Sequence, residues 1–189
     1  MTARHVRVAG LVAAALALAA AGLVLATPGG GDVLLVPNWS PWVEGELSCD
    51  LDADGADERL VVRDRRLSVL RGDSEAYRSP AGWLVSKALV GDVDDDGSRE
   101  VVLLVWKRGS YGTSHPFWAA PDDELGQHVL VLAWTEGTLR QRWMSSALHA
   151  HVAAAELDDG ARLILTTAEG SQTRWQWQQW GFALLDGTS

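Results

Sequence analysis

Two short segments of the sequence place aspartates on alternate positions directly before a glycine. Residues 49–58 read Cys-Asp-Leu-Asp-Ala-Asp-Gly-Ala-Asp-Glu, and residues 91–100 read Gly-Asp-Val-Asp-Asp-Asp-Gly-Ser-Arg-Glu. Oxygen ligands at positions 1, 3 and 5 followed by glycine at position 6 form the opening of an EF-hand-type calcium loop. Without a cation the neighbouring carboxylates would repel one another. The spacing therefore predicts a Ca²⁺ ion in each segment.

The two segments offer the same set of oxygen ligands. The glycine at position 6 permits the positive φ that reverses the chain, position 7 offers a backbone carbonyl, and a carboxylate at position 9 completes the shell. The predicted metal ligands are Asp50, Asp52, Asp54, Glu58, Asp92, Asp94, Asp96, Ser98 and Glu100. The alternative is that each segment is only an acidic β-turn, because Asp and Gly are common turn residues.

A third acidic segment, residues 155–160, reads Ala-Glu-Leu-Asp-Asp-Gly and is one residue shorter than the other two. Leu157 stands where the motif requires a ligand, which leaves only Glu156, Asp158 and Asp159 as acids. We therefore interpret this segment as a turn rather than as a metal site.

All three acidic segments lead into runs of apolar and β-branched residues, which are typical of β-strands. Helical periodicity is absent from the sequence after residue 30. The predicted strands cover residues 59–62, 66–71, 101–106, 129–134, 139–144, 163–167 and 173–185. This pattern predicts an all-β sandwich, barrel or propeller, and a repeat of about 40 residues matches one four-stranded propeller blade. With residues 32–46 as a partial unit, we expect about three to four blades, forming a partial or small β-propeller.

Residues 107–126 are rich in Gly, Ser, Pro and Asp, which predicts a long loop inserted between two strands of the second repeat. The loop places cationic and aromatic side chains on an otherwise acidic chain. The candidate ligand-binding residues are Lys107, Arg108, Tyr111, His115 and Trp118. A hydrolase of extracellular polymers, with His115 or His128 acting beside Asp122, is an alternative. The sequence contains no nucleophile elbow, metal triad or paired-acid motif to support it, so catalysis is not expected.

The first 31 residues have the composition of a membrane-targeting segment. Arg4 and Arg7 precede an uncharged apolar run at residues 8–26, and a Pro-Gly-Gly-Gly cluster follows soon after it. The run is longer than the roughly 7 to 15 residues of a cleaved signal and close to the roughly 20 that span a bilayer. We expect a transmembrane signal anchor or a signal peptide at residues 1–31, followed by an exported domain at residues 32–189. The basic residues predict a single-pass membrane protein with this domain outside, or a secreted protein if the leader is cleaved.

Charge and composition exclude some functions. The chain has 16 basic and 25 acidic residues and a formal net charge of −9, so it would repel the phosphate backbone of a nucleic acid. Cys49 is the only cysteine, which excludes an intrachain disulfide and a cysteine-rich zinc site. The ten tryptophans could stack on sugars, but packing across strands in a small β core is the favoured role, with Trp118 and the cluster at residues 175–180 as the expected exceptions.

The pattern Asp-x-Asp-x-Asp-Gly-x-x-Glu leading into an apolar strand resembles the FG-GAP and VCBS repeats of integrin-α-like propellers and of many secreted bacterial proteins. The resemblance covers roughly residues 46–185. It implies calcium bound at the acidic loops and a module that binds an extracellular protein or glycan. A structural or assembly protein of the envelope is the alternative, and a homo-oligomer would cover the sheet edges that so few blades leave exposed.

Overall fold

In the computed structural model, residues 36–37, 40, 42–110 and 122–188 are described. This part of the chain forms twelve strands and no helix, which confirms the predicted all-β class. The strands are β1 (Gly45–Cys49), β2 (Glu58–Arg63), β3 (Arg66–Arg71), β4 (Ser74–Arg78), β5 (Leu84–Gly91), β6 (Glu100–Arg108), β7 (Leu125–Thr135), β8 (Thr138–Met144), β9 (Val152–Leu157), β10 (Leu163–Thr167), β11 (Gln172–Gln178) and β12 (Gly181–Thr188).

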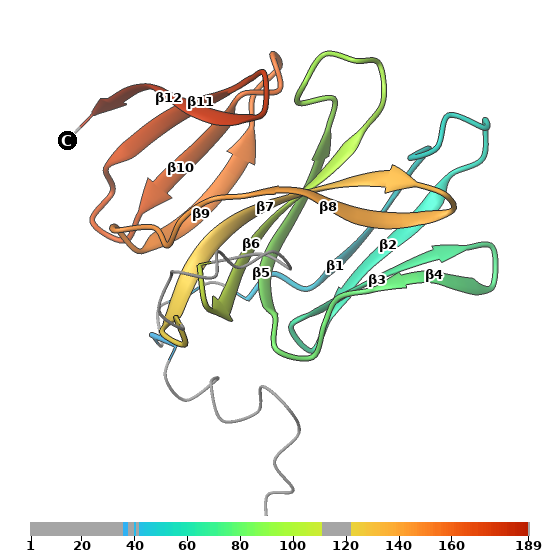
Figure 1. The fold of residues 1–189 in the computed structure, drawn as a ribbon, viewed down its shortest axis with the longest axis horizontal. Coiled ribbons are helices and arrows are strands. Elements are labelled where there is room, and N and C mark those ends of the chain that lie inside the picture. The colour runs from blue at the N-terminus through green and yellow to red at the C-terminus, as the bar shows by residue number, and fades with distance from the viewer. Residues whose placement is uncertain (1–35, 38–39, 41, 111–121, 189) are drawn as a thin grey trace, which may run out of the picture.

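The strands form three four-stranded antiparallel sheets, each made of four consecutive strands (Figure 1). The strand orders are β1-β2-β3-β4, β5-β6-β7-β8 and β12-β11-β10-β9, and we name them the first, central and third sheets. Within each sheet, every strand pairs with the next one along the chain, so each sheet is a local meander. Within the described residues these sheets form no closed barrel or propeller.

The observed strands refine the predicted ones. Residues 66–71 and 163–167 were predicted with the bounds that β3 and β10 have. Residues 173–185, predicted as one strand, are two, because the chain turns at Gln179 with a φ of 53° between β11 and β12. Gly45 and Glu46 open β1 of the first sheet and so belong to no additional unit.

The central sheet is buried on both faces because each outer sheet covers one of them. Along β6, Val101, Leu103 and Val105 pack in the core shared with the first sheet, whereas Val102 and Leu104 pack in the core shared with the third. All five are at most 2% exposed. Burying one such side chain contributes roughly 1.5–3 kcal/mol. The uninterrupted apolar run of β6 is therefore two alternating sets that serve two cores.

The strands of the outer sheets alternate instead. In β2, Leu60 and Val62 are buried, while Arg59 and Arg63 on the other face are exposed. This pattern is typical of a sheet with one covered face and one face in water. The central position of the second sheet thus explains why its sequence is the most apolar of the three.

Aromatic side chains join the central and third sheets. Trp143 of β8, Trp177 of β11 and Phe182 of β12 meet edge to face, with ring centroids 5.6–6.2 Å apart. The favoured packing role is confirmed at Trp143, and Trp177 also packs between the sheets although it lies in the cluster expected to depart from that role. Trp180, in the turn between β11 and β12, is 77% exposed and does not share that role.

The chain enters the fold at one end of the central sheet. Val36 packs against Leu84 and Trp106, and the indole Nε1 of Trp106 donates a hydrogen bond to Ser40 Oγ at 3.0 Å. Leu84 opens β5, so this end is opposite the loop at residues 92–99 that follows β5. The predicted leader at residues 1–31 lies outside the described residues, and the described part contains no helix of a length and hydrophobicity that would cross a bilayer.

Candidate divalent cation sites

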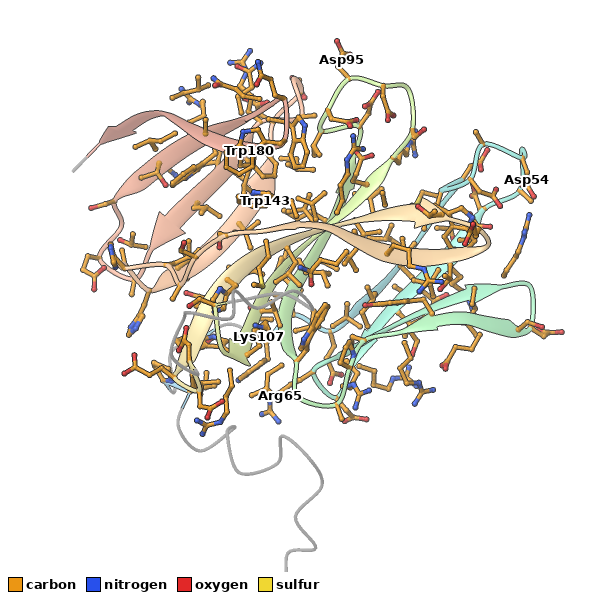
Figure 2. The ribbon with its side chains drawn as sticks, viewed as in Figure 1. Asp54, Arg65, Asp95, Lys107, Trp143 and Trp180 are labelled. Atoms are coloured by element: carbon orange, nitrogen blue, oxygen red, sulfur yellow. The ribbon has the colours of Figure 1, made fainter. Side chains whose placement is uncertain are left out.

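Both predicted calcium segments are loops between the first and second strands of a sheet. Loop 1, residues 50–57, joins β1 to β2, and loop 2, residues 92–99, joins β5 to β6. A shorter turn at residues 158–162 holds the same place between β9 and β10. Loops 1 and 2 line one common cavity, and loop 2 and the shorter turn line another. All three therefore lie at one end of the molecule, where Asp54 and Asp95 are seen (Figure 2).

The two loops have the same backbone conformation. Gly55 has a φ of 89° and Gly97 a φ of 88°, which confirms the positive φ predicted at position 6. Ala53 and Asp95, two residues earlier, also have positive φ values of 58° and 60°. An L-residue with a positive φ costs roughly 1–2 kcal/mol of conformational free energy. Sequence reasoning did not predict this strained conformation at Ala53 and Asp95. Equal strain in two loops of different composition indicates that the fold imposes one loop shape.

The first aspartate of each loop holds the reversal in place. Asp50 Oδ2 accepts a hydrogen bond from the N–H of Gly55 at 2.9 Å, and Asp92 Oδ2 accepts one from Gly97 at 3.0 Å. These bonds span five residues and close each loop on itself. The aspartates at position 1 are therefore oriented inward by backbone groups rather than left to solvent.

A buried glutamate closes each loop from the following strand. Glu58 is 0% exposed, and its Oε2 accepts a hydrogen bond from Leu51 N at 2.9 Å. Glu100 is 1% exposed, and its Oε2 accepts one from Val93 N at 3.1 Å. One oxygen of each carboxylate thus binds the backbone, and the other remains near the aspartates.

The acidic side chains converge in both loops. Two groups of carboxylates have oxygens within 4.8 Å of one another: Asp50, Asp52 and Glu58, and Asp92, Asp94 and Asp96. Three oxygens are shielded from solvent and accept no hydrogen bond from the described residues: Asp50 Oδ1, Glu58 Oε1 and Asp94 Oδ1. Buried anionic oxygens are costly without a positive partner. A donor set made only of carboxylates fits a hard divalent cation such as Ca²⁺.

One arginine contacts loop 1. The guanidinium of Arg71, at the end of β3, forms ion pairs with Asp52 at 3.0 Å, with Asp54, and with Glu58 at 3.7 Å. Asp54 is drawn toward this arginine and is not part of the converging group. One guanidinium thus forms ion pairs with three carboxylates of loop 1.

A second arginine contacts loop 2 in the same way. Arg142 of β8 forms ion pairs with Asp94, with Asp96 at 3.6 Å and with Glu100 at 3.4 Å. The three partners hold positions 3, 5 and 9 of the motif, as in loop 1. Sequence reasoning missed both arginines, because neither lies near its loop along the chain.

Glu100, which closes loop 2, has a pKa raised to about 7. Burial is the largest cause, because it disfavours the carboxylate, and Asp94 and Asp96 add negative charge. The N–H of Val93 and the charge of Arg142 act in the opposite direction. A cation binds the ionised form, so it would release a proton from Glu100 near neutral pH.

The position-5 aspartates titrate in the opposite direction. The N–H of Ala56, followed by the Arg71 guanidinium, holds the pKa of Asp54 below its usual value. The N–H of Ser98 is the main cause of the lowered pKa of Asp96. Both side chains are therefore ionised in water at neutral pH.

The shorter turn of the third sheet is built differently. Asp158 Oδ1 accepts hydrogen bonds from Gly160 N at 2.9 Å and from Arg162 N at 3.0 Å. Its acidic side chains join no converging carboxylate group in the described part of the chain. These contacts support the interpretation of this segment as a turn.

The two larger cavities beside loop 2 lie on different sides of it. One of about 760 Å³ lies between loop 2 and the turn of the third sheet, and Asp94, Gln176 and Trp177 are among its lining residues. Another of about 440 Å³ lies between loops 1 and 2, beside Trp134 and Arg140. The carboxylates of loop 2 are thus reachable from two sides.

The predicted ligand loop begins at the opposite end of β6, and its first residue is buried. Lys107 is 7% exposed and its Nζ donates to the carbonyl of Gly109. Burial lowers the pKa of Lys107, and Asp122 opposes the shift. His128 beside it is 0% exposed, its Nδ1 lies 3.0 Å from Ser145 O, and burial lowers its pKa.

The other predicted residues of that loop are only partly described. Arg108 is exposed, and its Nη1 donates to Asp123 O at 2.6 Å. Tyr111, His115 and Trp118 lie outside the described residues, so the ligand loop stays a prediction. Asp122 accepts hydrogen bonds from backbone N–H groups, at 2.9 Å in the case of Ser110. No described contact pairs it with a histidine as acid and base.

Comparison with known proteins identifies no relative: no protein-family model, curated protein or solved structure matches this chain.

Proposed function

We propose that this protein is a calcium-binding β-repeat module that works outside the cytoplasm, at the cell envelope, and binds a protein or a glycan without catalysis. The observation that carries the proposal is the carboxylate loop, present twice with the same backbone shape and with buried oxygens that accept no hydrogen bond from the described residues. Residues 1–31 would anchor the module in the membrane, or direct its secretion if they are cleaved.

A divalent cation would complete the charge balance of each loop. One guanidinium supplies a single positive charge to three carboxylates, so negative charge remains. Ca²⁺ takes six to eight oxygen ligands and would engage the oxygens that accept no hydrogen bond. The residues that would hold the two ions are Asp50, Asp52, Asp54, Glu58, Asp92, Asp94, Asp96, Ser98 and Glu100.

The placement of the loops supports the resemblance to FG-GAP and VCBS repeats. Each sheet is a meander of four consecutive strands, and in each one the acidic segment joins the first strand to the second. A repeated unit of this kind is what a propeller blade requires. We propose that the three sheets are blades of a small or partial propeller.

The cavities beside loop 2 are the proposed ligand surface. The larger one combines carboxylates with Gln176 and Trp177, and the smaller one adds Arg140 and Trp134. A few polar groups next to an aromatic ring suit a polar ligand such as a glycan or a protein side chain. The loop that begins at Lys107 is a second proposed ligand site.

A structural or assembly role is the second candidate function. β12 is an edge strand of the third sheet, Leu184 in it is 54% exposed, and Trp180 just before the strand is 77% exposed. An open edge with apolar side chains favours pairing with another copy. Sedimentation of the full-length protein would support this role if an oligomer forms with increasing concentration and is lost in Trp180→Ser.

Thermal unfolding with calcium and with excess chelator tests the proposed function, because a ligand that binds only the folded state raises the midpoint. Calcium at about 100 times its Kd would add about 2.7 kcal/mol per site. We expect the rise to shrink in a variant with Asp92→Asn and Asp94→Asn. Asp158→Asn, in the turn of the third sheet, is the matched control and keeps the full rise. An unchanged midpoint in the wild type would mean that both loops are only acidic turns.

A further inference from the structure

Loops 1 and 2 are each contacted by an arginine that reaches the same three motif positions. Arg71 pairs with the acids at positions 3, 5 and 9 of loop 1, and Arg142 pairs with those of loop 2. These positions are among the predicted calcium ligands. The guanidinium groups therefore lie among the oxygens that a cation would use.

The two arginines are not copies of one repeat position. Arg71 ends β3, the third strand of its sheet, whereas Arg142 lies inside β8, the fourth strand of the central sheet. Two different strands thus bring a positive charge to the same part of the loop. The common feature is the need of the carboxylates for a positive charge, and not the repeat pattern itself.

A guanidinium and a calcium ion cannot share these oxygens fully. Ca²⁺ needs its oxygen ligands at about 2.3–2.6 Å on several sides, and a cation placed there would repel a guanidinium that contacts the same carboxylates. Side-chain exposures of 47% for Arg71 and 36% for Arg142 leave both arginines a path into solvent. Binding of the ion then requires the arginine to move away.

We infer that Arg71 and Arg142 are internal competitors that set the calcium affinity of their loops, each being displaced when its loop binds the ion. The inference rests on the proposed function, since it concerns the same two loops. It makes each arginine a determinant of affinity although neither is a ligand of the ion.

Displacement at loop 2 has a consequence that loop 1 lacks. The Arg142 guanidinium carbon lies 5.5 Å from the centroid of the Trp177 ring in the third sheet. Trp177 also lines the cavity of about 760 Å³ between loop 2 and the third sheet. Arg142 itself lines the smaller cavity of about 440 Å³. Calcium at loop 2 would therefore uncover the Trp177 ring that Arg142 covers and change the lining of that proposed ligand cavity, and so couple the ion to ligand binding.

Calorimetric titration of the full-length protein with calcium tests the inference. We expect Arg142→Gln to raise the affinity of one site and Arg71→Gln that of the other, by about three- to tenfold each, with both raised in the double variant. Arg78→Gln is the control for Arg142, because Arg78 pairs with Glu75 and with no acid of either loop. Arg59→Gln is the control for Arg71, because Arg59 pairs with Glu46 instead.

The possible outcomes separate the two hypotheses. If neither the wild type nor any variant binds calcium, the proposed function fails. If the wild type binds and the two substitutions leave its affinity unchanged or weaken it, the arginines support the loops and the inference fails while the function stands.

A measurement on the wild type protects the test against misfolded variants. The Nε–H resonances of Arg71 and Arg142 can be followed by nuclear magnetic resonance during a calcium titration. We expect both to shift and to exchange faster with water as the loops fill. Unchanged resonances at saturating calcium would overturn the inference.

Discussion

Ionisable side chains are buried at both ends of β6, but the groups that surround them differ. At the end beside loop 2, Glu100 is buried with other acids, and Asp94 Oδ1 has no hydrogen-bond partner among the described residues. At the other end, Lys107 and His128 are buried, and the lysine donates to a backbone carbonyl with Asp122 nearby. One end gathers like charges, and the other mixes cationic groups with acceptors.

The difference teaches what each end can bind. Carboxylates that crowd together need positive charge, which Arg142 supplies in part and which a metal ion would complete under the proposed function. At the opposite end the unpaired atom is Nε2 of His128, and the charge of Lys107 opposes a proton there. The end of β6 at Glu100, the acidic end, therefore suits a cation, whereas the end at Lys107, the basic end, does not.

A substitution in the apolar middle of β6 gives a reference loss of unfolding free energy for the substitutions at its ends. Leu103 is 0% exposed in the core shared with the first sheet, so Leu103→Ala is expected to cost about 3–5 kcal/mol of unfolding free energy. Denaturation by urea measures it. Leu184→Ala, at a 54% exposed site, is the control and should cost less than about 0.5 kcal/mol. A loss at Leu103 below about 1 kcal/mol would mean that the centre of the strand is not well packed.

A substitution at the acidic end should cost less. Glu100→Ala leaves the buried N–H of Val93 without an acceptor, which we expect to cost about 1–3 kcal/mol in excess chelator. Glu100→Gln keeps an acceptor oxygen and should lose clearly less. Urea denaturation of both variants distinguishes the hydrogen bond from the charge. Equal losses would show that the charge, and not the acceptor, matters.

The turn of loop 2 should be sensitive through its backbone alone. The φ of Gly97 is +88°, and a Cβ added there meets no atom within 4 Å. Gly97→Ala is expected to destabilise by about 1–2 kcal/mol, because only the conformation is unfavourable. Gly45→Ala, where a Cβ also meets no atom but φ is not positive, is the matched control. Thermal unfolding compares them, and equal midpoints would contradict the loop geometry.

The basic end should respond to pH. The folded-state pKa of His128 lies below its ordinary value of 6.5, mainly through burial, and Lys107 lowers it further while Asp122 opposes the shift. The unfolded chain therefore takes up a proton that the folded chain does not. The stability that neutral His128 contributes is present above about pH 6.5 and is lost as the pH falls below that value.

We expect the unfolding free energy to fall more steeply between about pH 7 and pH 5 in the wild type than in His128→Gln. Urea denaturation in excess chelator across this range gives the two slopes. The opposite contribution of Glu100, whose raised pKa favours the folded state at low pH, is common to both proteins and cancels in the difference. Parallel slopes would show that His128 titrates as it does in the unfolded chain.

Much of the acidic end could be predicted from the sequence because its chemistry is local. The first six positions of the motif are consecutive in the chain and determine the loop reversal. The glycine at position 6 has the predicted positive φ in both loops. The apolar run of β6 also predicted a strand. Ser74–Arg78, by contrast, forms β4 although its composition is mainly polar and charged, because pairing with β3 decides its conformation.

The rest of the site depends on contacts between distant parts of the chain. Arg142 reaches Asp94 only because β8 lies in the same sheet as β6, and no local pattern marks it. The burial of Lys107 is equally hidden, since a lysine at the end of a strand is usually exposed. The topology, and not the composition, determines which charges meet.

The seat of the N-terminal segment determines how the molecule would bear mechanical tension. Val36 and Ser40 are held against Leu84 and Trp106, at the end of the central sheet away from loop 2. A pull from residues before Val36 would load these contacts first. These contacts precede β1 in the chain, so they would take the load before any strand pair does. Loop 1 follows β1 directly and would carry the load next, whereas loop 2 lies at the opposite end of the central sheet.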